Sequence, residues 1–356
     1  MTDTRPLASV SLDVDNLWSY LKTHGDAGWE SRPSYLDAFF PPLLDALDEL
    51  GLRITFFCVG VDAAQPGNRR AFQSLISRGH EVGNHSFQHE PWLHLYPRDR
   101  LEADIAEAED ALAQATGVRP IGFRGPGYSW SLDLLEVLAD RGYLYDASTL
   151  PTYIGPLARA YYFWTARLTP AQRAERKQLF GSFRDGLRPV KPYRWSLSGE
   201  RTLLEIPVTT MPVLKAPFHL SYLLYLARVS ESLMMSYLRT ALAVCRASGV
   251  EPSFLLHPLD VLGGDQVKEL AFFPGMDLSG ARKMTLFRKV LRALGERYRL
   301  VGMSEHARAI IQRPGIPLAS VVSHQPSTVG RQTSAVSRQP SAIGGLEAND
   351  TLKADG

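Results

Sequence analysis

The sequence has few cysteines, little net charge and no long apolar runs, and each lack excludes a class of protein. Its two cysteines, Cys58 and Cys245, lie far apart and match neither a disulfide framework nor a cysteine-rich metal site. Both sit in apolar stretches, so we expect buried free thiols in a reducing compartment. Lys and Arg number 39 against 37 Asp and Glu, which argues against a general nucleic-acid-binding protein. The longest apolar run, near residues 220–227, is too short to cross a bilayer.

The N-terminal sequence, MTDTRPLASVSLDVD, has an early acid and no apolar core of a signal peptide. We therefore expect a cytoplasmic protein that contacts the inner face of the membrane at most. A hydrophobic content of 45% and a charged content of 21% are typical of a globular chain. Its 356 residues suffice for one large α/β domain or two smaller ones. The oligomeric state has no signature in the sequence.

Short apolar segments alternate with amphipathic helical patterns along the chain. Strands are expected at residues 9–14, 53–60, 203–209, 253–257 and 298–303. Helices are expected at 97–116, 131–142 and 232–246. This alternation predicts a parallel sheet or a barrel, and such folds gather functional groups where the strands end.

Two regions differ in composition from the rest. Residues 156–195 hold nine Lys and Arg against Glu175 and Asp185, together with many aromatic residues. We expect a helical insertion there, either a solvated helical pair with buried aromatics or a surface that binds phosphate. Residues 314–356 are rich in Ser, Gln and Pro, which predicts a disordered tail after a domain of residues 1–313.

The stretch GNHSFQH places His85 and His89 four residues apart. If this segment is one helical turn, both imidazoles share a face and converge on one point. That arrangement fits a metal site, provided that another part of the chain supplies a third ligand. By spacing alone, a pair of structural histidines is the more common interpretation, since metal sites normally need a third ligand from elsewhere.

Acids, an arginine and a further histidine follow other expected strands. Asp13 and Asp15 end the run SLDVDN and would point to one side of an extended strand. Burying two acids together is costly without a cation. Arg124, in FRGPGYSW, is either an ordinary turn residue or the partner of one carboxylate. His257 ends SFLLH, where packing and chemistry are both open interpretations.

Taken together over residues 7–310, these segments resemble the polysaccharide deacetylase family, also called NodB homology or carbohydrate esterase family 4. SLDVDN is similar to its first motif, HSFQH to the second, RGPGY to the third and LLH to the fifth, while LLEIPVTTMP resembles its substrate-groove strand. The spaced D-x-D resembles the cytoplasmic branches most. The acid-rich fourth motif has no clear counterpart, and Asp146 is the nearest candidate. The resemblance implies an irregular (β/α) barrel of about seven parallel strands.

The resemblance also implies roles for these residues. Asp15, His85 and His89 would bind a divalent ion, with Zn²⁺ expected first and Co²⁺, Ni²⁺ or Mn²⁺ as alternatives. Asp13 would be the general base, held by Arg124.

A second group of residues would act on the substrate. His257 would protonate the leaving amine. The loop Pro126, Gly127 and Tyr128 would contact the substrate, with the Gly127 N–H stabilising the oxyanion.

The implied reaction removes an N-acyl group, acetyl or formyl, from an amino sugar. A lipid- or nucleotide-linked glycan precursor is the expected substrate, with Arg184, Arg188 and Lys191 as the surface that meets its phosphate. Three alternatives stay open at this point: a metal-independent ureide or imide amidohydrolase of the same fold, an O-deacetylase, and a catalytically silent glycan-binding module.

Overall fold

The computed structural model describes residues 3–166, 168–170, 173 and 183–320 of the chain. Ten strands are β1 (Leu7–Asp13), β2 (Thr55–Cys58), β3 (Glu81–Asn84), β4 (Gly122–Phe123), β5 (Tyr145–Asp146), β6 (Tyr193–Ser196), β7 (Thr202–Glu205), β8 (Ser253–Leu256), β9 (Arg299–Val301) and β10 (Leu318–Ser320). The helices are α1 (Leu17–His24), α2 (Leu36–Glu49), α3 (Gly60–Ala63), α4 (Arg69–Ser77), α5 (Arg98–Thr116), α6 (Leu132–Asp140), α7 (Gly155–Thr165), α9 (Leu220–Val229), α10 (Glu231–Ala247), α11 (Gly280–Gly295) and α12 (Met303–Ile311).

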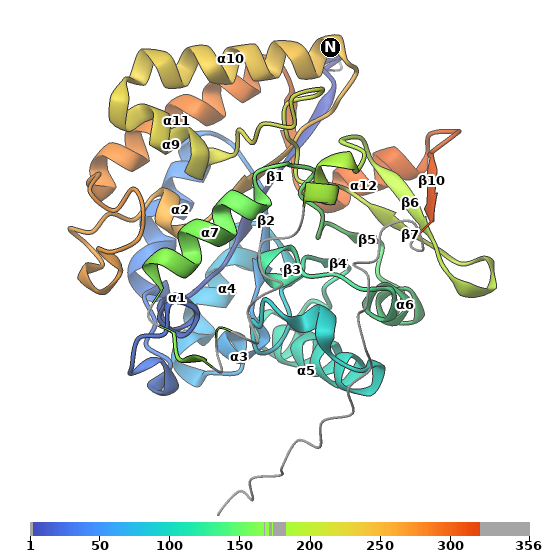
Figure 1. Ribbon diagram of the computed structural model, residues 1–356, viewed down its shortest axis with the longest axis horizontal. Coiled ribbons are helices and arrows are strands. Elements are labelled where there is room, and N and C mark those ends of the chain that lie inside the picture. Colours follow the sequence, from blue (N-terminus) through green and yellow to red (C-terminus); the bar gives the residue numbers. More distant parts are fainter. Residues whose placement is uncertain (1–2, 167, 171–172, 174–182, 321–356) are drawn as a thin grey trace, which may run out of the picture. The chain divides into compact units, whose positions relative to one another are not determined.

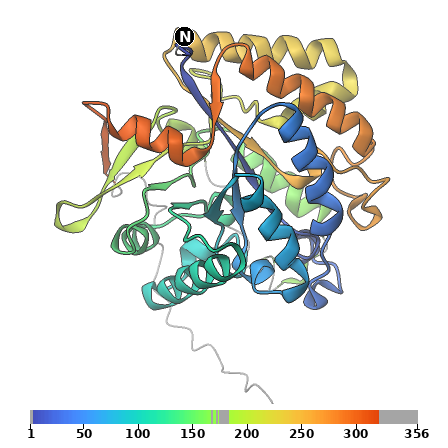
Figure 2. The same cartoon turned by 180° about the vertical axis from the view of Figure 1, so that it is seen from behind.

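Seven mutually parallel strands form the centre of the sheet, in the order β8-β1-β2-β3-β4-β5-β7. Strand β9 also pairs with β1 in parallel, whereas β6 runs antiparallel to β7 and carries β10 at its outer edge (Figures 1 and 2). The predicted α/β fold with a mostly parallel sheet is therefore confirmed.

The segment that follows β7 brings the two ends of the parallel sheet into contact. The Thr209 N–H donates to the Ser253 carbonyl at 2.9 Å, and the Ser253 N–H donates to Thr209 Oγ1 at 2.8 Å. Regular strand pairing does not join β7 to β8 in the described part of the chain. These irregular hydrogen bonds across the seam are what makes the architecture barrel-like.

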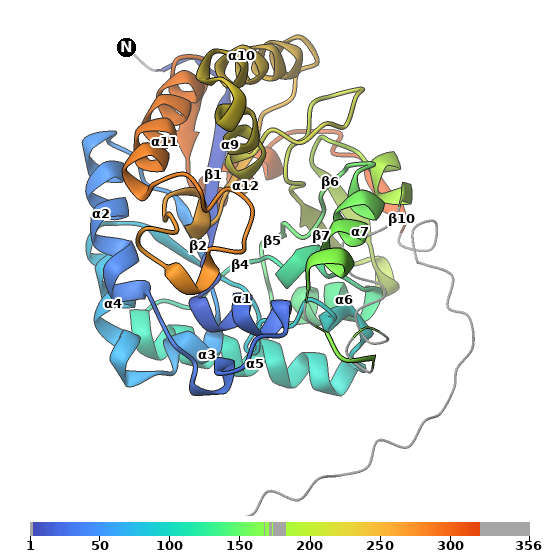
Figure 3. The same cartoon turned by 60° about the vertical axis from the view of Figure 1, so that its left-hand side comes forward.

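Helices cover the strands, as Figure 3 shows for α2, α4, α5, α6 and α11. All seven residues of β1, LASVSLD, are buried, because this strand lies between neighbouring strands and beneath helices on its faces. A polar residue at the end of such a strand is therefore held rigidly at the edge of the core.

Several predicted elements agree with the structure. The helix expected at 97–116 is α5, which ends at Gly117 with a φ of 77°, a conformation that suits glycine. The helix expected at 131–142 is α6, and Ser131 Oγ accepts a hydrogen bond from the Leu134 N–H as its N-cap. Both cysteines are buried and free, as expected. None of the described helices is long and apolar enough to cross a membrane.

Two boundaries differ from the expectation. The insertion predicted as helical up to residue 195 ends in β6, whose Tyr193 and Trp195 belong to the core. The predicted disordered tail begins too early, because Leu318–Ser320 form β10 and pair with β6. Residues 321–356, the rest of that tail, lie outside the described residues.

Candidate active site

The polar side chains singled out in the sequence follow four strands at one edge of the sheet. Asp13 ends β1 and Asp15 comes two residues later, while His85, Arg124 and His257 directly follow β3, β4 and β8. Because the carboxyl ends of parallel strands lie at the same edge, these residues from distant parts of the chain come together.

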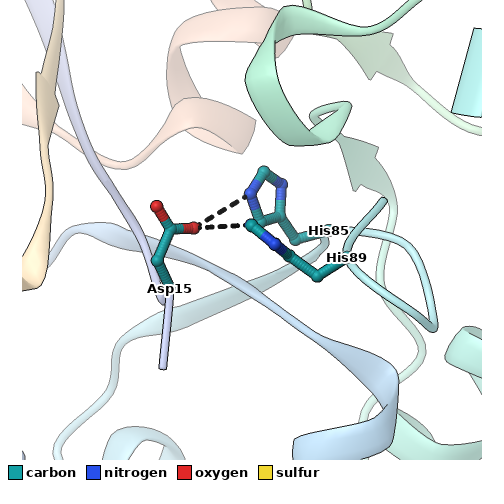
Figure 4. A group of neighbouring side chains, drawn as sticks. All are labelled: Asp15, His85 and His89. Atoms are coloured by element: carbon teal, nitrogen blue, oxygen red, sulfur yellow. Dashed lines mark hydrogen bonds and ion pairs between the residues drawn. The ribbon is translucent and has the colours of Figure 1, made fainter. Parts of the chain in front are cut away.

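The side chains of Asp15, His85 and His89 converge on one point. Asp15 Oδ1 lies 2.9 Å from His89 Nε2 and 3.4 Å from His85 Nε2 (Figure 4). The three ligand atoms all lie within 4.8 Å of one another. Both imidazoles are buried, and the carboxylate of Asp15 is largely shielded. This geometry makes Asp15, His85 and His89 a candidate metal site.

The segment that carries the two histidines is not the helical turn expected from their spacing. Ser86 and His89 have φ values of 63° and 49°, in the left-handed region that non-glycine residues rarely adopt. Side-chain hydrogen bonds hold this loop: Asn84 Oδ1 accepts from the Ser86 N–H at 2.8 Å, and Ser86 Oγ accepts from the His89 N–H at 3.0 Å. The histidines converge because the loop turns back, which an i,i+4 pattern does not predict.

The tautomer of His85 fits a bound cation. Its Nδ1–H donates to the Arg124 carbonyl oxygen at 2.6 Å. The lone pair of the neutral ring is then on Nε2, the atom that faces Asp15. Two imidazole nitrogens and one carboxylate form a ligand set that suits Zn²⁺ and leaves a coordination position open.

The ionisation of these residues is coupled. Burial alone would raise the pKa of Asp15, but the charge of His89 and hydrogen bonds from both histidines hold it well below its usual range. Burial alone would lower the pKa of His85, yet the charge of Asp13 and the hydrogen bond to Asp15 raise it. The neighbouring histidines therefore hold the Asp15 carboxylate in its ionised form.

Asp13 has a different partner. Arg124 Nη1 donates to Asp13 Oδ1 at 2.7 Å and lies 2.9 Å from Ser11 Oγ, while its Nε donates to the Ala147 carbonyl at 3.0 Å. The guanidinium is fully buried and lies 4.4 Å over the ring of Phe57. Such a buried charge-assisted contact fixes one oxygen of Asp13.

The loop after Arg124 is held close to the site. Gly125 donates its N–H to Ser148 Oγ at 2.8 Å, and a side chain at position 125 would overlap the Ser129 carbonyl. Gly127 and Tyr128 have φ values of 58° and 61°. The N–H groups of Tyr128 and Ser129 donate to carbonyls within this loop.

His257 stands on a braced turn. Its Nδ1 lies 3.3 Å from Ser221 Oγ and 3.9 Å from Asp260 Oδ2, which also accepts from the His257 N–H at 2.8 Å. Burial raises the pKa of Asp260. The buried Lys283 Nζ donates to the carbonyls of Leu259 and Leu262 and so fixes the turn from α11. The contacts of the His257 ring with Ser221 and Asp260 therefore involve Nδ1.

Sequence reasoning missed a layer of residues behind the ligands. Asp62 Oδ1 accepts from Asn16 Nδ2 at 2.9 Å and from Trp18 Nε1 at 2.8 Å, and the Trp18 ring meets His89 edge-on at 6.3 Å. Asp62 thereby supports both the turn that carries Asp15 and the ring of His89. One indication of this layer was visible in the sequence: Asp62 is an acid inside the apolar run that follows β2. Burial and then the charge of Asp15 raise the pKa of Tyr20, which also lies beside the site.

Asp146, the nearest candidate for the fourth motif, contacts a different group. Its Oδ1 accepts from the Ala147 N–H at 2.9 Å and from Ser148 Oγ at 2.5 Å, so it supports the loop of Gly125 through Ser148. In the sheet it lies beside Glu205 of β7, another acid that the sequence did not single out. Burial raises the pKa of Asp146 to about 6 and that of Glu205 well above its usual value.

The three cations expected to form one phosphate-binding surface do not share an exposed face. Arg184 and Lys191 are exposed. Arg188 is buried: its Nε donates to Asp185 Oδ1 at 2.8 Å, and its guanidinium lies 4.3 Å over the ring of Trp130. The prediction of Arg188 as a surface residue is wrong, because a stacking partner from another part of the chain covers it.

Comparisons with known proteins agree with this geometry. Residues 25–145 match the family model for polysaccharide deacetylases. Over 133 residues the chain is 32% identical to the chitooligosaccharide deacetylase of Sinorhizobium fredii, covering 35% of this chain and 60% of that protein. Over 110 residues it is 34% identical to a peptidoglycan deacetylase-like protein of Gibberella zeae, covering 30% and 31%. The chain thus spans less than two thirds of the length of the curated relatives it matches.

A solved structure shares the fold over nearly the whole chain. A protein of Mycobacterium smegmatis, described as a polysaccharide deacetylase, superposes with a TM-score of 0.56 at 19% identity, covering 93% of this chain and 96% of that one. These findings show that residues 25–145 are similar to polysaccharide deacetylases and that the chain shares the fold of the Mycobacterium smegmatis protein.

Proposed function

We propose that the protein is a metal-dependent hydrolase that removes an N-acyl group from an amino sugar. The observation that carries this proposal is the convergence of Asp15, His85 and His89 next to an Asp13 held by Arg124. Relatives named as deacetylases of chitooligosaccharides and of peptidoglycan N-acetylglucosamine support the same reaction class.

The three ligands would hold a divalent cation, with Zn²⁺ favoured by the mixture of two imidazoles and one carboxylate. When bound, such a cation acts as a Lewis acid toward the substrate carbonyl and lowers the pKa of water. The hydrogen bond from His85 to the Arg124 carbonyl keeps the ring in the tautomer that presents Nε2.

Asp13 would accept the proton of the attacking water. Arg124 occupies Asp13 Oδ1, so the proton would go to Oδ2. The charge of the buried guanidinium offsets the cost of keeping a carboxylate ionised in this pocket. Deprotonation at a fixed atom makes water a nucleophile in the position that the ligands define.

His257 would protonate the nitrogen that leaves, because an amide nitrogen departs readily only as a neutral amine. Its Nδ1 is engaged by Ser221 and Asp260, so Nε2 would deliver the proton. We assign oxyanion stabilisation to the Gly127 N–H, since the N–H groups of Tyr128 and Ser129 are already engaged within the loop.

For the substrate, we propose an N-acetylated or N-formylated sugar of a lipid- or nucleotide-linked precursor in the cytoplasm. The exposed Arg184 and Lys191 support a phosphate-bearing carrier, although Arg188 contributes to packing instead.

One experiment tests the activity and the carrier together. The purified, zinc-loaded protein is incubated with N-acetylchitooligosaccharides and with extracted lipid- and nucleotide-linked glycan precursors, and the products are analysed by mass spectrometry. Loss of one acetyl or one formyl group from any of them, abolished in Asp13→Asn, supports the proposal. Intact acylated sugars in every sample would contradict it.

The carrier surface has its own test. Reversing both exposed charges, Arg184→Glu with Lys191→Glu, should lower turnover of a phosphate-linked substrate by about 3- to 30-fold, as expected for lost electrostatic attraction. Turnover of an uncharged oligosaccharide should not change. Arg239→Glu with Arg246→Glu, two exposed positions on α10, serves as the matched control. An equal loss on both substrates would exclude the phosphate-binding role.

A further inference from the structure

His219 is a buried imidazole beside the site that neither the motifs nor the proposed mechanism uses. It precedes α9 as its N-cap residue, and only 4% of its surface is exposed. Its Nδ1 has no hydrogen-bond partner among the described residues. The chain therefore places a polar ring in its interior without satisfying it.

The surroundings of His219 locate it on the His257 side of the site. Its ring centroid lies 6.1 Å from that of His257 and meets the ring of Tyr222 edge-on at 4.6 Å. Two residues further on, Ser221 contacts His257 directly. Burial, followed by the charges of His257 and Arg124, holds the pKa of His219 well below its usual value, so the ring is neutral.

An unsatisfied buried imidazole is costly. Leaving one buried donor or acceptor without a partner destabilises a fold, and native proteins retain few such groups. A phenylalanine at position 219 would keep the edge contact with Tyr222 without that cost. A neutral imidazole offers one N–H donor and one lone pair, which suits the hydroxyl and ether oxygens of a sugar.

We propose that His219 is a substrate-binding residue that hydrogen-bonds to the amino-sugar part of the substrate, next to the departing nitrogen. This inference rests on the proposed function, because the proposed reaction fixes which group of the substrate lies next to each residue. The cluster of Asp15, His85 and His89 faces the acyl carbonyl, and His257 faces the nitrogen. His219 lies next to His257, so it would meet the sugar attached to that nitrogen rather than the acyl group.

This assignment predicts different effects on the binding of the two reaction products, the amino sugar and acetate. The amine product contains the sugar that His219 would contact, whereas acetate occupies only the acyl side. His219→Phe should weaken binding of a glucosamine oligosaccharide about tenfold, the effect of one lost hydrogen bond, and should leave acetate binding unchanged. Isothermal titration calorimetry of each product against the zinc-loaded protein measures both.

His80 provides a matched control. It is also 4% exposed and also has one ring nitrogen without a partner among the described residues, but it precedes β3 at the opposite end of the strands. His80→Phe should leave the affinity for both products unchanged. His219→Asn and His219→Gln place an amide near Nδ1 and Nε2 respectively, and one of them should recover affinity for the glucosamine oligosaccharide.

Any of three results would overturn the inference. In the first, His219→Phe weakens the binding of acetate and of the glucosamine oligosaccharide equally, which indicates a general change in the site. In the second, the wild-type protein does not bind the glucosamine oligosaccharide, and in the third, His219→Phe binds it as tightly as the wild type. The titration requires no turnover, so failure of the proposed function appears separately, as acetylated oligosaccharide that stays intact.

Discussion

Two pairs of buried acids stand at the same edge of the sheet, and they behave in opposite ways. Asp13 and Asp15 follow β1, and each has a positive partner: Arg124 for Asp13 and the two histidines for Asp15. Asp146 and Glu205 lie side by side on β5 and β7. Their hydrogen bonds come from neutral donors of the backbone, Ser148, Thr149 and Trp195.

The difference shows that the partner, and not the residue type, decides what a buried carboxylate does. The charge of His89 and hydrogen bonds from both histidines hold the pKa of Asp15 well below the usual range, whereas burial outweighs the hydrogen bonds and the charge of Arg124 and raises the pKa of Asp146 to about 6. The first pair has the charged surroundings that a candidate cation site and a proposed general base need. The second pair retains a proton and supports the loop of Gly125.

The largest effect should come from removing the ligand carboxylate. Asp15→Asn takes the negative charge from the cluster. Metal affinity should therefore fall by well over the 10- to 100-fold that is typical when a residue that only hydrogen-bonds to a ligand is lost. Turnover should fall to that of the metal-free protein. Elemental analysis and activity after dialysis measure both. Asp45→Asn, an exposed acid on α2, is the control. Full zinc content in Asp15→Asn would exclude this residue as a ligand.

A smaller loss of turnover should follow from Asp13→Asn. The amide keeps the shape of the side chain but cannot accept the proton, so turnover should fall about 10²- to 10⁴-fold while zinc content stays at the wild-type level. Steady-state kinetics together with elemental analysis distinguish this result from that of Asp15→Asn. Wild-type turnover in the variant would show that another group is the base.

Without Arg124, the buried carboxylate of Asp13 would lack a positive partner, as Asp146 and Glu205 do in their hydrogen bonds. Arg124→Met leaves a buried carboxylate without its cation, which should lower the free energy of unfolding by about 3–5 kcal/mol. Urea denaturation measures the change. Combining Arg124→Met with Asp13→Asn should restore part of the loss, because an amide needs no counter-charge. A double variant no more stable than Arg124→Met would contradict this account.

The smallest effect concerns the second pair and depends on pH. The folded-state pKa of Asp146 lies above its unfolded value, so the folded state binds the proton more tightly and the unfolding free energy falls as pH rises from about 4 through 6. Asp146→Asn removes this ionisation, and its stability relative to the wild type should increase by on the order of 1–3 kcal/mol across that range. Urea denaturation at a series of pH values measures it, and a difference that does not vary with pH would contradict it.

The sequence predicted those parts of the fold and site that depend on local pattern. Strands β1, β2 and β8 are apolar runs, so their positions could be predicted, and with them those of Asp13, Asp15 and His257 at the ends of β1 and β8. Strands β4 and β5 have two residues each, too few for any periodicity.

The remaining features depend on contacts between distant segments. Arg188 looks exposed in a basic segment, but Trp130 covers it. His219 stands in the apolar run APFHLSYLL, and only the fold places it near His257. Glu205, like Asp62, was a missed residue with a visible signal, since an acid within the strand sequence TLLE is expected to need a partner.

Arg124 acts through both its side chain and its backbone. Its guanidinium donates a hydrogen bond to Asp13, and its carbonyl oxygen accepts one from the Nδ1–H of His85. Substitutions that move its backbone would therefore disturb two functions at once, and their effects would not add. For directed evolution, libraries built around this position would mostly yield inactive clones. Changes of substrate preference are better sought on α9, whose first residues approach the site without supporting residue 124.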